Sequence, residues 1–143
     1  MSSCCSDKND VSHSHRKQPC PECHNFSYAV KVRTLLHQIK YPDNLNIDNE
    51  NYYFCSSVSC MVGYFSLSGN IIHKNQLRNH QQILNKKICF CFDINEETYT
   101  KAKNPEEIKS FVKNQTKLGL CACDIRNPSG QCCLTHFKVL DSN

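Results

Sequence analysis

Two stretches decide the fold of the first half of this chain: Cys20-Pro21-Glu22-Cys23 and, 31 residues later, a run that begins with Tyr52-Tyr53-Phe54-Cys55 and ends at Cys60. A Cys-x2-Cys turn lets two thiolates converge on one ion, and a second pair of cysteines completes a tetrahedral site of four sulfurs. Both pairs lie beside short segments of β-rich composition. The spacing therefore predicts a structural zinc ion held by Cys20, Cys23, Cys55 and Cys60.

The same four cysteines have two other interpretations: reduced or disulfide-bonded thiols, and a rubredoxin-like iron site. His24 follows the first pair and could replace one ligand, but all four cysteines are present, so we expect it at the surface. A bound ion contributes folding free energy directly. That contribution matters here, because only 39% of the 143 residues are apolar and there is no tryptophan.

The second half of the chain contains six more cysteines, as Cys89-x-Cys91, Cys121-x-Cys123 and Cys132-Cys133. This is not the spacing of a zinc knuckle. If Cys89 and Cys91 are extended, their side chains share a face about 6–7 Å apart along the chain, which is wide for a disulfide and suits neighbouring atoms of a metal cluster. Adjacent side chains diverge, so Cys132 and Cys133 are not both expected as ligands. The residues alone leave the third and fourth ligands open.

Composition and motifs exclude several classes of protein. No apolar run approaches the roughly 18 residues of a membrane helix, and residues 1–17 lack the apolar segment of a secretory signal. We therefore expect a cytoplasmic protein whose cysteines serve metal or redox chemistry; a disulfide-bonded protein cut from a secreted precursor is the alternative. No enzyme is expected, because no motif fixes a cysteine beside any of the histidines at 37, 73, 80 and 136.

The order of local signals predicts an α+β fold in two units. Residues 1–18 are polar and read as a disordered tail, residues 19–88 as a β-rich zinc-binding unit, and residues 89–143 as a unit of short helices around the second cysteine set. In the first unit, segments 52–54, 61–65 and 71–73 are predicted strands, with a turn at 68–70. In the second, Asn104-Pro105-Glu106-Glu107 marks the start of an amphipathic helix.

Five stretches also match a known family. They are Cys-Pro-x-Cys at 20–23, Tyr-Tyr-Phe-Cys-x4-Cys at 52–60, Tyr-Phe-Ser at 64–66, Cys-x-Cys-Phe at 89–92, and Cys-Ala-Cys-Asp-Ile-Arg-Asn-Pro-Ser-Gly-Gln-Cys-Cys-Leu at 121–134. Over roughly residues 19–135 the chain resembles the N-terminal zinc and iron–sulfur domain of CopZ-type copper chaperones. The resemblance implies zinc on the first four cysteines and a 2Fe–2S cluster on later ones.

The second half is also similar to bacterioferritin-associated ferredoxin, a small helical fold with a Cys-x-Cys pair and a later cysteine pair. That similarity implies Cys89, Cys91, Cys123 and Cys133 as cluster ligands, with Cys121 or Cys132 as substitutes for either of the last two. The cofactors expected from the resemblance are thus one Zn2+ and one 2Fe–2S cluster.

The function implied by the resemblance is electron transfer by a small redox protein linked to copper handling. Its partner would be a redox protein such as a copper chaperone domain or a copper transporter. Chaperones of this type also carry a copper-binding domain with a Met-x-Cys-x2-Cys loop; the one Cys-x2-Cys here is at 20–23, so we expect no copper-carrying module in this sequence. The alternatives are a zinc-only binding module and an iron–sulfur sensor or cluster carrier.

The net charge bears on nucleic-acid binding. The chain has a formal charge of +4. Eight ligating thiolates would contribute eight negative charges. A zinc ion and an oxidised 2Fe–2S core would each contribute two positive charges, so the formal net charge would be about zero. No nucleic-acid partner is therefore expected. The lysines at 86 and 87 and the scattered lysines at 101, 103, 109, 113 and 117 are expected to form a solvated face or a docking face for an acidic partner.

Overall fold

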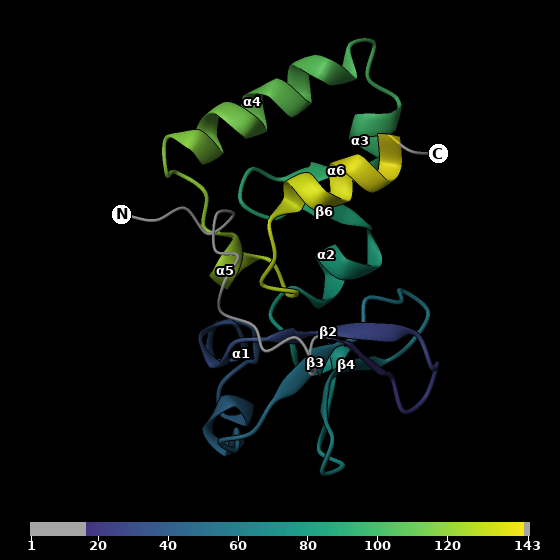
Figure 1. Ribbon diagram of the computed structural model, residues 1–143, viewed down its shortest axis with the longest axis vertical. Helices are drawn as coiled ribbons and strands as arrows, with labels where there is room; N and C mark the ends of the chain where they lie inside the picture. The colour runs from purple at the N-terminus through teal and green to yellow at the C-terminus, as the bar shows by residue number, and fades with distance from the viewer. Residues whose placement is uncertain (1–16, 142–143) are drawn as a thin grey trace.

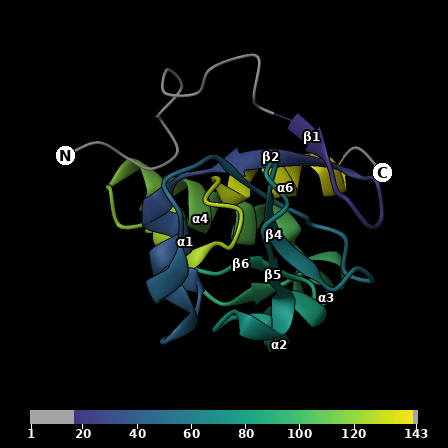
Figure 2. The same cartoon turned by 90° about the horizontal axis from the view of Figure 1, so that it is seen from below.

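The computed structural model describes residues 17–141, without the side chain of Val139, and has the expected mixture of strands and short helices. A five-stranded sheet lies at one end of the long axis, and helices α3, α4 and α6 gather at the other (Figure 1). Seen from below, the sheet end lies in front of the helical end (Figure 2).

The elements of the first unit are strands β1 (Lys17–Pro19), β2 (Phe26–Val30), β3 (Tyr52–Phe54), β4 (Val62–Ser66) and β5 (Ile71–His73), helices α1 (Val32–Gln38) and α2 (His80–Leu84), and the 3-10 helices η2 (Asp43–Asn46) and η3 (Lys74–Gln76). The second unit contains strands β6 (Lys87–Cys89) and β7 (Ile94–Asn95) and helices α3 (Glu96–Thr100), α4 (Pro105–Lys117), α5 (Cys123–Arg126) and α6 (Cys133–Asp141).

The sheet is antiparallel in the order β1-β2-β3-β4-β5. Side chains alternate between its faces, so Tyr52 and Phe54 pack on one side and Tyr53 on the other. The register of β4 shifts between Val62 and Tyr64. Because of this irregularity Val62 faces the same side as Tyr53, and the predicted hairpin at 61–73 is present.

Each face of the sheet has its own core. On one face, Tyr52, Phe54 and Tyr64 pack against Leu35 of α1 and Leu77 after η3. Ile39 and Ile83 complete this core. Among the described residues, the large apolar side chains buried on the other face are those of Tyr53, Val62 and Phe65, and they pack with cysteines. The second face is therefore a cysteine-lined core.

The second unit is built around a third core, in which cysteines again take the place of apolar residues. Ile88, Tyr99, Val112 and Phe137 pack there with Cys89 and further cysteines. Helix α4 begins as predicted, with Asn104 at the N-cap and Pro105 in the first turn, although the Asn104 side chain makes no capping bond. In the described part of the chain no helix is long and apolar enough to cross a membrane.

Three local predictions differ from the structure. The predicted tail at 1–18 lies outside the described residues as far as residue 16, but Lys17 and Gln18 belong to β1, where they pair with β2 and Lys17 lies over the ring of Tyr28. Thr34 precedes the apolar residues at 35, 36 and 39 and is predicted from the sequence to cap a short helix, but it lies inside α1 and its hydroxyl donates to the second unit instead. Cys91 lies in the turn after β6, so it does not share an extended strand with Cys89.

The two units meet where α1 lies beside α5. The Thr34 hydroxyl donates to the carbonyl of Asp124 at 2.6 Å, and the buried Gln38 amide donates to the carbonyls of Ile125 and Arg126 at 2.8 and 3.0 Å. Asn79 reinforces the contact by donating to both the Gln38 side-chain oxygen and the Arg126 carbonyl. These bonds use the last carbonyls of the short helix that begins at Cys123, so the first unit fixes the position of that helix.

Gly130 provides a test of this interface. It has a positive φ of 72°, and a Cβ there would lie 2.7 Å from the Thr34 hydroxyl oxygen. Gly130→Ala should therefore lower the free energy of unfolding for two reasons. A non-glycine residue in the left-handed conformation costs about 1–2 kcal/mol, and overpacking against Thr34 costs about 1–3 kcal/mol more. Gly69→Ala is the matched control, because Gly69 has a φ of 104° and open space around it.

The measurement is urea unfolding of both metal-loaded variants, followed by circular dichroism. Thr34→Ala should relieve part of the Gly130→Ala penalty in the double variant, since it removes the group in the way. A Gly130→Ala protein as stable as Gly69→Ala would show that the contact with Thr34 does not constrain the interface.

Candidate metal centres

The sulfurs of Cys20, Cys23, Cys55 and Cys60 all lie within 4.8 Å of one another. Cys20 Sγ is 3.9 Å from Cys60 Sγ, and Cys23 Sγ is 3.5 Å from Cys55 Sγ. A zinc ion about 2.3 Å from each of four sulfurs defines a tetrahedron with edges of about 3.8 Å. The donor atoms and their separations therefore fit zinc, and three of these four side chains are buried.

Two turns present these sulfurs. In the first, the Cys20 carbonyl accepts from the His24 amide and the Cys20 amide donates to Asn25, with His24 at a positive φ of 66°. In the second, the Cys55 amide donates to Gly63 and the Cys60 amide to Ser57. His24 is exposed, as expected, and is not part of the four-sulfur group.

Burial disfavours the charged form of two of these thiols. It raises the pKa of Cys55 and of Cys60, because a thiolate loses its hydration there. The pKa of Cys23 is lowered, chiefly by a hydrogen bond with the backbone of Asn25. A cation must therefore compensate the charge of the deprotonated set, and a divalent zinc ion supplies that charge.

The second cysteine set has a different geometry. Cys91 Sγ lies 3.7 Å from Cys123 Sγ, and the thiols of Cys123 and Cys89 both lie close enough to Cys133 to shift its pKa. The sulfurs thus form an extended series from Cys89 through Cys133 and Cys123 to Cys91. In the described part of the chain, Cys20, Cys23, Cys55 and Cys60 are the one group of three or more possible ligands that lie within 4.8 Å of one another. The second set is therefore more extended than a site for one ion.

Backbone amides and burial shape this second set. The Phe92 amide donates to Cys89 Sγ at 3.3 Å, and the Ala122 amide donates to Cys91 Sγ at 3.0 Å. Hydrogen bonds with Cys123 and Cys89 lower the pKa of Cys133 to about 4, whereas the pKa of Cys89 is raised by its bond with Cys133 and by burial. Four thiols with amide donors are a donor set that suits an iron–sulfur cluster.

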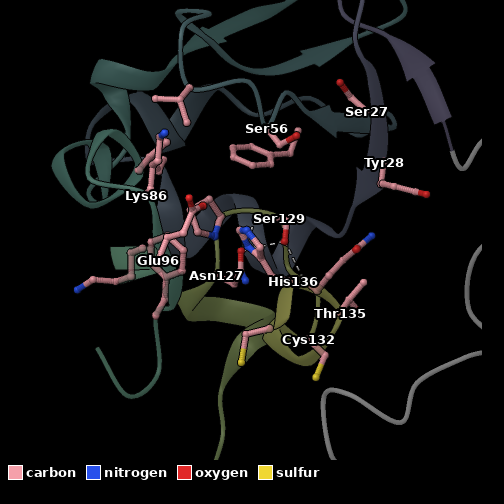
Figure 3. Close-up of a pocket in the computed structure, with 18 of the residues that line it drawn as sticks. Ser27, Tyr28, Ser56, Lys86, Glu96, Asn127, Ser129, Cys132, Thr135 and His136 are labelled. Carbon is pink, nitrogen blue, oxygen red and sulfur yellow. Dashed lines mark hydrogen bonds between the residues drawn. The ribbon is translucent and has the colours of Figure 1, made fainter. Parts of the chain in front are cut away.

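The remaining two cysteines of the second half lie at the edge of this arrangement. Cys121 is half-buried against the core of the second unit. Cys132 is half-buried and lines a cavity of about 450 Å³ between the sheet and α6, together with Cys133 (Figure 3). Lys86, Glu96 and His136 also line this cavity, whose surface is mainly apolar, and the cavity lies on the Cys133 side of the set.

Two residues of the site could not be found from the sequence. Lys74 is fully buried beside the four-sulfur group, and Gln38 is fully buried at the junction with α5. Lys74 lies in a basic, amide-rich stretch that predicts a linker or a short helix, and Gln38 is a polar residue near the end of a short helix. No motif marks either one, because their burial depends on contacts distant in sequence.

Comparison with known proteins agrees with the geometry of the first site. Residues 17–78 match the family model of the CopZ zinc-binding domain. This chain carries a CopZ-type zinc-binding domain. It is 28% identical over 131 residues to the copper chaperone CopZ of Archaeoglobus fulgidus, a match that covers 85% of this chain and 60% of that protein. This chain therefore spans less than two thirds of the chaperone's length.

The resemblance extends to three dimensions and beyond the zinc-binding domain. The X-ray structure of the Archaeoglobus fulgidus CopZ N-terminal domain superposes with a TM-score of 0.68 at 28% identity. The match covers 87% of this chain and 98% of that one. The second unit is thus part of the likeness, which supports the resemblance expected from the sequence.

Loss of one buried sulfur should release zinc from the CopZ-type domain. Structural zinc binds with about 10–16 kcal/mol, so we expect Cys55→Ser to weaken binding by about 100-fold or more and to destabilise the sheet. Cys121→Ser is the control and should retain its zinc. Zinc content after dialysis against a chelator and far-ultraviolet circular dichroism measure the two effects. A Cys55→Ser protein that retains zinc as well as the control would refute this ligand set.

Proposed function

We propose that this chain is a small zinc- and 2Fe–2S-binding electron-transfer protein that serves copper handling. In this proposal zinc is structural and the second cysteine set is the working centre. The protein is proposed to act without catalysing a reaction of its own, in the cytoplasm, by exchanging an electron with a protein partner. The link to copper rests on the likeness to a copper chaperone.

The observation that carries the proposal is the extended series of sulfur contacts from Cys89 through Cys133 and Cys123 to Cys91. These four residues come from β6, the turn after it and the first residues of α5 and α6. The contacts favour Cys123 and Cys133 as the last two ligands over Cys121 and Cys132, the choice that the spacing leaves open.

A bound 2Fe–2S cluster would supply one-electron redox chemistry. This chain's residues would hold it and adjust its potential. The amides of Phe92 and Ala122 already donate to sulfurs of the set and would favour the more negative, reduced state. Three of the four sulfurs are buried in the core, which lowers the local dielectric, while Cys91 is only half-buried.

The surroundings of the set suit transfer to another protein. The half-buried Cys91 lies on one side of the set, and the cavity lies on the side of Cys133. The exposed lysines at 113 and 117 of α4 supply positive charge on the same unit, which would attract an acidic redox partner. We propose a copper chaperone domain or a copper transporter as that partner.

Metal and sulfide analysis of anaerobically purified protein tests the proposal. We expect about one zinc, two irons and two acid-labile sulfides per chain, with a visible absorption band that bleaches on reduction and an EPR signal from the reduced state. A colourless protein with zinc alone would overturn the proposal in favour of a zinc-only module. A cluster that passes intact to an apo-acceptor would indicate a cluster carrier instead.

Serine variants test the ligand assignment. Cys123→Ser and Cys133→Ser should each lose most of the iron and sulfide while keeping one zinc, because each removes a sulfur in the middle of the contact series. Cys121→Ser and Cys132→Ser are the matched controls and should keep the visible spectrum. If Cys121→Ser loses the cluster and Cys123→Ser keeps it, the assignment is wrong although a cluster is present.

A further inference from the structure

Lys74 is a fully buried lysine at the start of η3, directly behind the zinc-binding cysteines. Its ammonium donates to three backbone carbonyls, those of Ser57, Cys60 and Val62, at 2.9, 2.7 and 2.6 Å. All three acceptors belong to the turn that carries Cys60 or to the residues just after it. The ammonium also lies 5.9 Å from the centre of the Phe54 ring.

A buried cation of this kind needs an anion. Lysine is almost never fully buried without a partner, and an uncompensated charge in a protein interior is costly. No carboxylate in the described part of the chain forms an ion pair with Lys74. Its protons are all used by carbonyls, which solvate the ammonium but carry no net charge.

The negative charge comes from the cysteines. Each of the four thiolates would attract the Lys74 ammonium, Cys55 most strongly and then Cys60. Four thiolates around one divalent zinc ion carry a net charge of −2, and burial disfavours that charge. The ammonium and the tetrathiolate therefore offset each other's burial, although Lys74 is not a ligand.

We propose that Lys74 is the built-in counter-charge of the zinc site and, through its three carbonyl bonds, the residue that positions the Cys60 turn. It acts through the ligands, so it is a positioning residue. The inference rests on zinc binding by the first unit and not on the 2Fe–2S cluster. It separates two contributions, the positive charge and the hydrogen bonds, which different substitutions remove.

The test compares zinc affinity at one fixed pH, by chelator competition on the full chain. Lys74→Met removes the charge and the bonds, Lys74→Gln removes the charge but keeps donors, and Lys74→Arg keeps the charge. We expect Met and Gln to weaken zinc binding at least about tenfold and Arg, which keeps the positive charge, to bind zinc more tightly than either of them. Lys40→Met, at an exposed lysine of the same unit, is the control and should bind zinc as the wild type does.

A double-mutant cycle keeps the proposal testable if Lys74→Met folds poorly. Cys23→His replaces the half-buried ligand with a neutral one and reduces the charge of the site by one. If Lys74 compensates charge, the penalty of Lys74→Gln should be at least about threefold smaller in the Cys23→His background.

Equal penalties in the two backgrounds would overturn the counter-charge, as would a Gln variant that binds zinc as tightly as the wild type. Cobalt substitution gives a second reading, because the sulfur-to-cobalt charge-transfer bands report whether all four thiolates remain bound. A Lys74→Gln protein with full-intensity bands and unchanged affinity would leave Lys74 a purely structural residue.

Discussion

The convergence of four sulfurs on one face of a small sheet is the constraint on which the first unit depends. Among the described residues, that face buries Tyr53, Val62 and Phe65 as its large apolar side chains, so apolar burial contributes little on that side of the sheet. Burial also raises the pKa of the Cys55 and Cys60 thiols, which disfavours their charged form in the absence of a cation. Zinc resolves both problems, because it compensates the thiolates and cross-links turns that are distant in sequence.

The second unit depends on the first through the hydrogen bonds between α1 and α5. A helix of four residues is not stable alone, because nucleation is not repaid over one turn. Gln38, Thr34 and Asn79 supply donors for the carbonyls at the end of this helix, and Cys123 begins it. The position of a sulfur in the second set is thus maintained by side chains of the zinc-binding unit. Zinc thus stabilises the sheet, the sheet supports α1, and α1 holds Cys123 in position.

How far the sequence predicts this structure depends on how local each feature is. The hairpin at 61–73 and the start of α4 at Asn104-Pro105 follow from local patterns and are present as predicted. The convergence of the first four cysteines follows from knuckle spacing. The placement of Cys91 in a turn, the role of Thr34 at the interface and the burial of Lys74 could not be predicted, because tertiary contacts decide them. Whether Cys121 or Cys123 is the better candidate for a cluster ligand also depends on where α5 begins.

One residue type thus produces two kinds of site within one chain, and geometry makes the difference. In the first set the four sulfurs lie within 4.8 Å of one another, and the Lys74 ammonium donates to the backbone carbonyl of Cys60. A closed tetrahedral site with a fixed counter-charge suits a structural ion that does not exchange. In the second set the sulfurs are extended, amides donate to Cys89 and Cys91, and a cavity reaches Cys133. The electron transfer that we propose for the second set would need that closeness to the surface, and a structural zinc ion does not.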